Sequence, residues 1–197
     1  MVEASSESPN IVKDFSLGRA RECSLAIARS DSEIFRQGAV TLSAGGESNW
    51  YFDARRLNLI PEGGYWTSLA LINLIGNTFP ETQAVGGSGV DGRLVVSTIV
   101  PLSAVLYREK LISRPFSGFF VTDDGQIEGY CGKTNNLVVE GTTTTGASTI
   151  LTIRWLVAQG KGVDGAIAIL DRGGGQAIRR AGFHFVSLFT PVDLGIF

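Results

Sequence analysis

Short apolar blocks alternate with polar stretches along the chain, and their internal spacing predicts strands and helices in turn. A short apolar run bounded by turn residues is typical of a buried strand, whereas apolar residues three and four positions apart are typical of an amphipathic helix. Strands are predicted at residues 39–43, 49–53, 104–107, 118–121, 137–139, 165–170 and 185–189, and at the start of a glycine-rich segment at 84–92. Helices are predicted at residues 11–30, 33–38, 65–79, 93–103 and 149–158, and around Ile178.

The order of these elements predicts an α/β fold built on a doubly wound, mainly parallel sheet. Strands that alternate with helices form parallel sheets with helices on both faces. Strands 39–43 and 49–53 are an exception, because the turn residues 44–47 between them predict an antiparallel hairpin. Pro61 is expected to break the chain after this hairpin, and residues 13–197 are expected to form a single domain.

The stretch of residues 137–158 has the pattern of a phosphate site. A buried strand leads to Glu140, a turn rich in hydroxyl groups follows, and a helix begins near Thr149. Backbone N–H groups and the positive end of a helix dipole meet at such a turn, and Gly146 lets the backbone approach an oxyanion. The alternative is that the hydroxyl groups only cap the first turn of a crossover helix. The predicted phosphate-binding residues are Thr144, Thr145, Gly146, Ala147, Ser148 and Thr149.

Length and charge restrict the classes of partner. A chain of 197 residues is long enough for one sizeable domain, and residues 1–12 have so little to bury that we expect them to be disordered. A net charge of −2 gives no electrostatic basis for binding nucleic acid or an anionic membrane. No apolar run reaches the length of a membrane span and the polar N-terminus does not resemble a signal peptide, so we expect a cytoplasmic protein.

Cysteine and histidine usage predicts no metal site. Cys23 and Cys131 have neither the spacing of zinc ligands nor that of a disulfide framework, so both are expected to be reduced. The single histidine, His184, lies in an apolar segment without a second histidine to complete a metal pair. We therefore expect no metal ligands among these residues.

Five segments, in the same order and at similar spacing, resemble the orotate phosphoribosyltransferases, a subfamily of the type I phosphoribosyltransferases. The hydroxyl-rich turn likewise resembles the loop with which that family binds 5-phosphoribosyl 1-pyrophosphate (PRPP). The resemblance implies the type I phosphoribosyltransferase fold, with a small N-terminal hood formed by about residues 33–60. It also implies a symmetric homodimer, for which the apolar residues 95–106 would offer a surface. The five segments are residues 51–57, 85–92, 115–121, 170–175 and 187–194.

The resemblance assigns roles to individual residues. Glu140 matches the first of two adjacent carboxylates that hold the ribose hydroxyls, and Asp171 is a second family-matched candidate for the catalytic machinery. Arg172 matches the arginine that meets the orotate carboxylate. An active enzyme would use PRPP together with Mg²⁺. The substrate-binding residues implied in this way are Tyr51, Phe52, Thr144 and Arg172.

Several departures from the family pattern lie at positions that the resemblance assigns to substrate binding and catalysis. A mobile loop with basic residues is replaced by a short stretch that carries Asp123 and Asp124. Asp91 brings a carboxylate to the segment that resembles the pyrophosphate-binding loop. Ser43 stands where the family often has an orotate-contacting lysine, and Gly141 removes the second ribose-binding carboxylate.

These departures leave three hypotheses about function. The first is a degenerate family member without appreciable orotate transfer, kept as a dimeric module that binds a nucleotide, a phosphate or a protein partner. The second is an active phosphoribosyltransferase of pyrimidine nucleotide synthesis, acting on orotate or another base. The third is a structural dimer that binds no nucleotide. Loss of cations near the leaving group favours the first hypothesis over the second, and the retained hydroxyl-rich turn favours it over the third.

Overall fold

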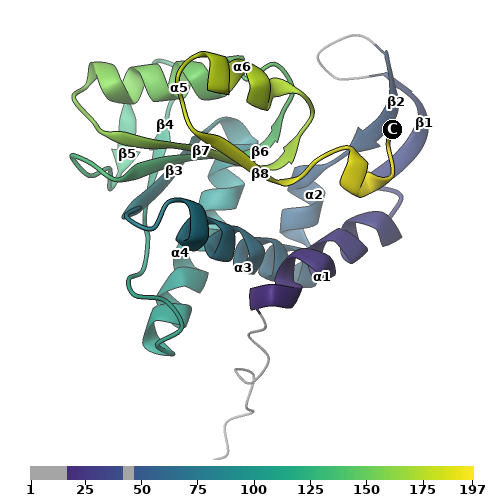
Figure 1. The fold of residues 1–197 in the computed structure, drawn as a ribbon, viewed down its shortest axis with the longest axis horizontal. Coiled ribbons are helices and arrows are strands. Elements are labelled where there is room, and N and C mark those ends of the chain that lie inside the picture. Colours follow the sequence, from purple (N-terminus) through teal and green to yellow (C-terminus); the bar gives the residue numbers. More distant parts are fainter. Residues whose placement is uncertain (1–16, 42–46) are drawn as a thin grey trace, which may run out of the picture.

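The computed structural model describes residues 17–41 and 47–197 of the chain. The segment at 1–12 that is predicted to be disordered, Ser43 and most of the predicted hairpin turn lie outside the described residues. Within the described part, helices cover both faces of a six-stranded sheet (Figure 1).

This sheet confirms the predicted doubly wound, mainly parallel arrangement. Its strands follow the order β5-β4-β3-β6-β7-β8, and neighbours are parallel except for the antiparallel pair of β4 and β5. The central strand β6 is paired with β3 on one side and β7 on the other, and it is buried along nearly its whole length. The strands are β3 (Ala84–Ser88), β4 (Ser117–Val121), β5 (Ile127–Gly129), β6 (Asn136–Thr143), β7 (Val163–Asp171) and β8 (Phe185–Phe189).

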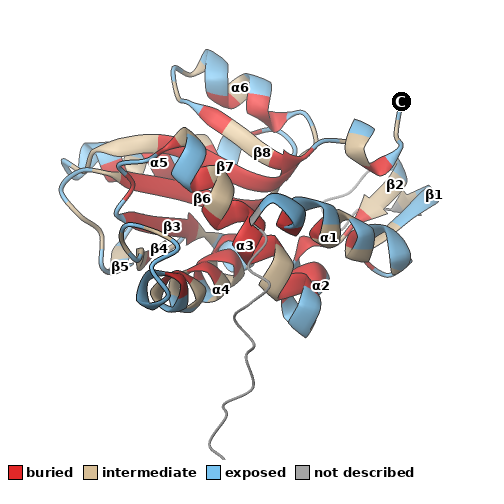
Figure 2. Cartoon of the chain, turned by 60° about the horizontal axis from the view of Figure 1, so that its bottom comes forward, coloured by how far each residue is buried: buried red, intermediate tan, exposed pale blue. Residues whose placement is uncertain are grey.

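Helices on the two faces divide the core into two clusters, which appear as the buried strands and inner helix faces of Figure 2. Leu137 and Val139 of β6 belong to the cluster under α1, α3 and α4, whereas Val138 belongs to the cluster under α5 and α6. The alternation is that of a strand, and it places Glu140 and Gly141 on opposite faces. The helices are α1 (Leu17–Ser30), α2 (Ala54–Leu59), α3 (Pro61–Thr78), α4 (Gly89–Arg108), α5 (Ala147–Ala158) and α6 (Gly174–Arg180), with a 3₁₀ turn at Val192–Leu194.

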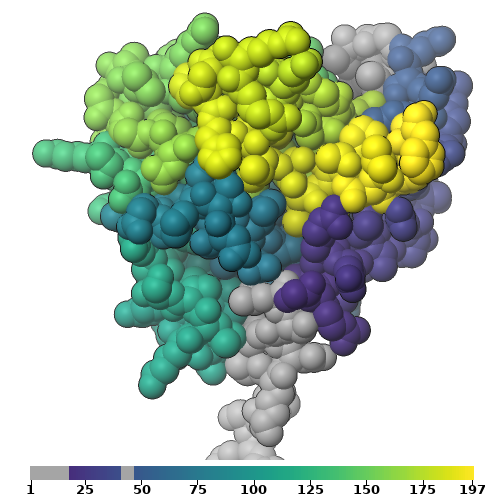
Figure 3. All heavy atoms as spheres, in the orientation of Figure 1, coloured from purple at the N-terminus to yellow at the C-terminus, as the bar shows by residue number. Residues whose placement is uncertain are grey.

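A second, two-stranded antiparallel sheet of β1 (Phe35–Thr41) and β2 (Glu47–Phe52) forms the predicted hairpin. Together with α2 we call it the hood, and it lies at the end of the molecule where the chain ends (Figure 1). The N-terminal helix is tied to the C-terminal segment, because Arg21 Nε donates to the Leu188 carbonyl at 2.9 Å and its guanidinium pairs with Asp193 at 2.6 Å. Figure 3 shows the purple and yellow segments in contact there.

Two predicted elements are wrong in type. The segment 104–107, predicted as a strand, is the last part of α4, since a short apolar run does not by itself distinguish a strand from a buried helix. Packing of the whole helix against β3 and β6 decides its conformation, and Pro101 within it does not end it. The predicted helix at 33–38 is also wrong, because β1 begins at Phe35 and pairs with β2.

The chain after the hairpin is helical rather than broken. Asp53 caps the short helix α2, which the sequence pattern did not predict, by accepting from two backbone N–H groups. Pro61 then occupies the first turn of α3, where its fixed φ suits a helix and its missing N–H has no intrahelical partner to lose. Pro61 therefore starts a helix instead of ending one.

Helix α4 bears on two expectations. It is long and apolar enough to cross a membrane by length and composition alone, contrary to the expectation that no apolar run reaches that length. A core helix of a soluble domain passes the same test, and α4 packs on the sheet. Residues 95–106 of this helix are partly exposed, since Val105 lies on the surface whereas several others face the core. Those buried residues are Val95, Val96, Ile99 and Leu106.

The junction of β3 and α4 is packed so closely on β6 that Gly87 tolerates no added side chain. A Cβ at Gly87 would lie 2.7 Å from Gly92 Cα and 2.8 Å from the Val139 carbonyl oxygen, and both are backbone atoms. We predict that Gly87→Ala lowers the free energy of unfolding by about 1–3 kcal/mol, because the two backbones must separate. Denaturant unfolding monitored by circular dichroism measures this change.

The matched control is Gly76→Ala in α3, where an added Cβ meets nothing within 4 Å. Alanine is the better helix former at such an exposed position, so this variant should gain roughly 0.5–1 kcal/mol. Equal stability of the two variants would contradict the close packing of the β3–α4 turn.

Candidate functional site

Two helix N-termini meet above the carboxyl ends of β3 and β6. Helix α4 begins at Gly89 after β3, and α5 begins at Ala147 after β6, and neither N-cap residue forms a side-chain cap. A cavity of about 440 Å³ lies between them, lined by residues of both first turns and of the β4–β5 turn. Free N–H groups and two positive dipole ends make this cavity suited to an anion.

The predicted phosphate-binding turn presents most of its residues to solvent. Thr144, Thr145, Ala147 and Ser148 are exposed, and the Thr145 hydroxyl accepts weakly from the Ala147 N–H at 3.3 Å. Thr149 differs from them, because it is fully buried and its hydroxyl is directed at Glu140, 3.5 Å away. Its side chain is therefore not available to an anion at this helix terminus.

Gly146 has the left-handed conformation expected of a glycine here, with φ 76°. A Cβ at this position would lie 2.7 Å from the Gly174 carbonyl oxygen and 2.9 Å from Ile178 Cγ1. Packing of the turn on α6 is thus a steric reason for this glycine, and the approach of an oxyanion, which the sequence suggested, stays a prediction.

Glu140 lies at the floor of the same cavity and is 7% exposed. Burial, and then the nearby charge of Asp91, raise its pKa to about 8, although hydrogen bonds from Thr149 and Ser148 oppose the shift. At neutral pH its carboxyl group is therefore mostly protonated, so it can donate as well as accept a hydrogen bond.

Gly141 faces away from Glu140, toward the hood. The space that its side chain would fill holds Ala54 and the carboxylate of Asp91. Asp91 belongs to the first turn of α4, and Arg55 Nε approaches its Oδ1 to 3.5 Å. Burial raises the pKa of Asp91, although the charge of Arg55 acts in the opposite direction.

A second cavity of about 610 Å³ lies between the hood and the main sheet, and Tyr51, Phe52 and Arg172 line it as the resemblance implied. The Arg172 guanidinium lies 3.9 Å from the centroid of the Trp50 ring and donates to the Ser48 hydroxyl at 3.0 Å. Cation–π stacking and this hydrogen bond fix the direction in which Arg172 points.

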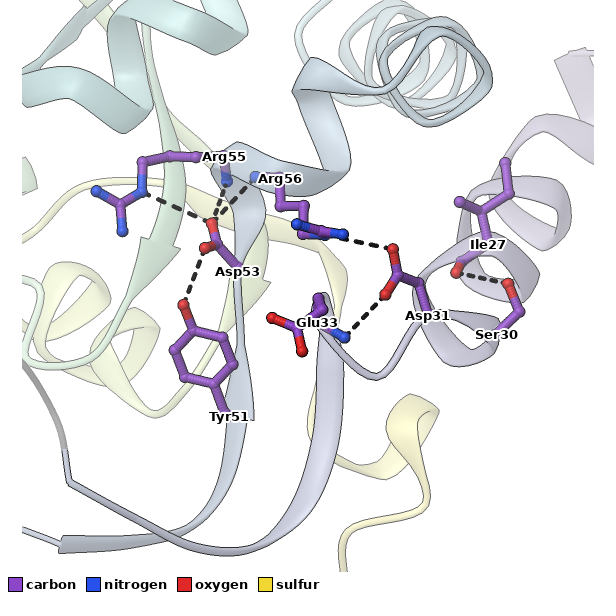
Figure 4. Close-up of polar contacts among 8 residues, drawn as sticks. All are labelled: Ile27, Ser30, Asp31, Glu33, Tyr51, Asp53, Arg55 and Arg56. Atoms are coloured by element: carbon purple, nitrogen blue, oxygen red, sulfur yellow. Dashed lines mark hydrogen bonds and ion pairs between the residues drawn. The ribbon is translucent and has the colours of Figure 1, made fainter.

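Within the hood, a polar cluster joins the β1–β2 hairpin to the first turn of α2 (Figure 4). Asp53 Oδ1 accepts from the backbone N–H groups of Arg55 and Arg56 at 2.9 and 3.0 Å, and its Oδ2 accepts from the Tyr51 hydroxyl at 2.9 Å. Although burial opposes it, these hydrogen bonds hold the pKa of Asp53 below its usual value. Asp31 extends the cluster by pairing with Arg56 Nε at 3.3 Å.

Two residues of this second cavity were not predicted. Arg36 lines it and lies 4.7 Å over the Tyr51 ring, and Arg55 lines it between Asp53 and Asp91. Strand pairing is needed to place Arg36, because it sets this residue opposite Tyr51, whereas Arg55 lies within the segment 51–57 that the resemblance had already identified. With Arg172 they give this cavity three guanidinium groups.

Asp171 is placed differently from the other candidates. Its Oδ1 accepts from the backbone N–H groups of Gly173 and Gly175, at 2.8 and 3.0 Å, and so it holds the first turn of α6. It lines neither of the two cavities described above. Its contacts are those of a structural carboxylate.

The turn between β4 and β5 is short and held in place. A Cβ at Gly125 would lie 3.0 Å from the Trp155 ring of α5, and Gln159 Nε2 donates to the Gly125 carbonyl at 2.9 Å. Asp124 is bonded within the turn, to Thr122 and Gln126, whereas Asp123 lines the first cavity. The lining of that cavity includes three carboxyl groups and no lysine or arginine among the described residues.

Known proteins resemble the chain along most of its length, although no family model matches it. The orotate phosphoribosyltransferase of Sorangium cellulosum is 32% identical over 186 residues, which are 88% of this chain and 92% of that protein. The crystal structure of Mycobacterium tuberculosis orotate phosphoribosyltransferase with inorganic phosphate superposes with a TM-score of 0.73 at 27% identity, covering 91% of this chain and 100% of that one.

The same Mycobacterium tuberculosis enzyme in complex with PRPP superposes with a TM-score of 0.68 at 24% identity, covering 90% of this chain and 93% of that one. The likeness therefore extends over 88–91% of this chain. On this identity and coverage, the chain belongs to the orotate phosphoribosyltransferase family.

Proposed function

We propose that this chain is a family member that binds a sugar phosphate at the N-terminus of α5 but has lost efficient orotate transfer. In this proposal it serves as a dimeric ligand-binding, regulatory or assembly module. The observation that carries the proposal is the first cavity, whose lining combines two helix N-termini with carboxylates and no cation among the described residues.

The electrostatics of that cavity oppose a diphosphate leaving group. Asp91 and Asp123 line the side formed by the first turn of α4 and the β4–β5 turn. Two unit charges ~8 Å apart at an effective dielectric of ~20 interact by roughly 2 kcal/mol, and here the sign is repulsive. Groups that stabilise transition-state charge are typically worth a few kcal/mol each, so their replacement by carboxylates slows transfer strongly.

The β4–β5 turn supports the same proposal. The resemblance implies a mobile, basic loop at this place, which closes over PRPP and carries charge to the diphosphate. Here Trp155 and Gln159 hold a short turn against α5. A short turn held in this way differs from the mobile loop that the resemblance implies.

Binding of a phosphate monoester does not require the cations that the first cavity lacks among the described residues. The turn before α5 offers backbone N–H groups, exposed hydroxyls and a helix dipole, and these suffice for a modest anion site. The family member from Mycobacterium tuberculosis that this chain resembles has been crystallised with inorganic phosphate.

A second candidate function is active transfer to an anionic base, and the hood cavity favours it. Arg36, Arg55 and Arg172 line that cavity and give it the positive charge that a carboxylate-bearing base requires. The relatives named above are orotate phosphoribosyltransferases, which supports this candidate as well.

An active enzyme would take Mg²⁺ together with PRPP. Within residues 17–41 and 47–197 no group of three or more acidic, cysteine or histidine side chains could hold a metal ion. Asp91 and Asp123 offer oxygen ligands of the kind that Mg²⁺ prefers, but the ion would need the diphosphate for most of its coordination. The residues present thus fit a metal that arrives with its substrate.

We further propose a homodimer in the cytoplasm. Between α3 and α4 lies an apolar groove of about 460 Å³, with the exposed side chains of Leu59 and Val105 at its edge. A second subunit would cover the apolar area of this groove.

Light scattering at micromolar concentration is expected to return twice the monomer mass of 21.0 kDa. Val105→Glu should shift the protein toward the monomer, because a charge would be buried in the interface. Leu151→Glu, at an exposed apolar site on α5, is the matched control and should remain dimeric. A monomer mass for the unmodified protein would contradict the dimer.

Orotate transfer is expected to be absent or several orders of magnitude below the usual enzyme range, because the first cavity repels the diphosphate. The assay follows orotate absorbance in the presence of PRPP and Mg²⁺. Turnover near ~1 s⁻¹ falls within the ordinary range of enzymes and would establish the second candidate instead.

The raised pKa of Glu140 predicts a pH-dependent stability. Between its ordinary pKa of 4.5 and the folded value of about 8, the folded state binds more protons than the unfolded state. The free energy of unfolding therefore falls as pH rises through this window, and the loss is complete above pH ~8. Glu140→Gln cannot titrate, so its stability relative to the unmodified protein should rise from pH 5 to 8 in thermal melts. Parallel curves for the two proteins would contradict the raised pKa.

A further inference from the structure

The place of the side chain missing at residue 141 is taken by a residue from another element. A Cβ built on Gly141 would lie 2.9 Å from Asp91 Cβ and 3.1 Å from Asp91 Oδ2. These distances are too short for two separate side chains, so a side chain at 141 and Asp91 in this position exclude each other. The carboxylate of Asp91 thus lies at the end of β6 although it belongs to α4.

The orientation of Asp91 is set by its surroundings. Arg55 Nε approaches Oδ1 to 3.5 Å, while Oδ2 is the oxygen nearest Gly141. Asp91 and Thr142 line both the cavity at the helix N-termini and the cavity under the hood. The carboxylate therefore lies where a ligand that extends from one cavity into the other must pass.

Glu140 supplies a second carboxyl group close to this point. It lines the cavity at the helix N-termini, and its protonation responds to the charge of Asp91. An ionised carboxylate only accepts hydrogen bonds, whereas a protonated carboxyl group also donates one. Such a pair offers complementary partners to neighbouring hydroxyl groups, which each donate and accept.

We propose that Asp91 replaces the side chain missing at residue 141, and that Asp91 and Glu140 together bind adjacent hydroxyl groups of a sugar phosphate. The phosphate of this ligand lies at the N-terminus of α5. The inference rests on the proposed function, since it names the class of ligand that the same site takes. The inference also gives the Asp91 carboxylate two effects. It accepts a hydrogen bond from a sugar hydroxyl, and it repels a diphosphate.

Calorimetric titration with ribose 5-phosphate, 2-deoxyribose 5-phosphate and inorganic phosphate tests the inference. The unmodified protein should bind ribose 5-phosphate about tenfold more tightly than the deoxy sugar, since one hydrogen bond to a charged group is lost. Asp91→Ala should reduce this ratio to near one and leave inorganic phosphate bound. Asp91→Asn keeps the shape of the side chain and should reduce the ratio as well, which covers the case in which the alanine variant folds poorly.

A double variant provides the sharpest test. Gly141→Asp alone should destabilise the protein, because the new side chain meets Asp91. Gly141→Asp combined with Asp91→Gly removes the contact with Asp91 and leaves only the one with Ala54 Cβ at 3.0 Å, returns a carboxylate to the end of β6, and should restore the preference for ribose. Asp123→Ala is the matched control, since it removes a charge from the same cavity and should strengthen all three ligands alike.

The outcomes separate the inference from the proposal on which it rests. If phosphate still binds and Asp91→Ala keeps the tenfold ratio, the role of Asp91 is overturned and the phosphate site stands. If none of the three ligands binds to the unmodified protein, the phosphate site and the inference are both overturned.

Discussion

The structure around the site depends on the direct contact between the β3–α4 turn and strand β6. Gly87 and Gly92 bring the two backbones so close that a Cβ at either position would approach the Val139 carbonyl oxygen within 3 Å. This contact places the first turn of α4 beside the end of β6. Because the turn is fixed there, Asp91 reaches the space above Gly141, and the N-termini of α4 and α5 face one cavity.

The two cavities that this arrangement forms differ in the charged groups that line them. The cavity at the helix N-termini combines dipoles that favour an anion with carboxylates that oppose a second one, so it suits a single phosphate better than a phosphate and a diphosphate together. The cavity under the hood has three guanidinium groups, and Arg172 is held in place by Trp50. Burial keeps Glu140 largely neutral at pH 7, which limits the charge that the first cavity carries.

The sequence predicted the parts of this structure that follow from local pattern. The parallel sheet, the hairpin and the turn before α5 each have a continuous signal, since apolar runs and turn residues stand next to one another along the chain. The segment 104–107 was misread because its apolar run suits a strand as well as a helix, and only packing against β3 and β6 distinguishes them.

The parts of the site that the sequence did not predict are contacts between elements far apart in the chain. In the sequence, Gly141 indicates the loss of a carboxylate and Asp91 indicates a repulsive charge. The two residues are 50 positions apart, so the sequence does not show that Asp91 occupies the space next to Gly141. Arg36 was missed for the same reason, since strand pairing is needed to place it opposite Tyr51. The family resemblance identified Asp171 as a candidate, whereas its hydrogen bonds to the backbone N–H groups of Gly173 and Gly175 hold the first turn of α6.

The central claim is that the site accepts a phosphate monoester and discriminates against the diphosphate of PRPP. Competitive calorimetry, in which PRPP is titrated into protein saturated with ribose 5-phosphate, compares the two ligands at one site. The account predicts that ribose 5-phosphate binds in the range of roughly 0.1–1 mM and that PRPP displaces it poorly, with or without Mg²⁺. Displacement by PRPP at a concentration well below that of ribose 5-phosphate would contradict it.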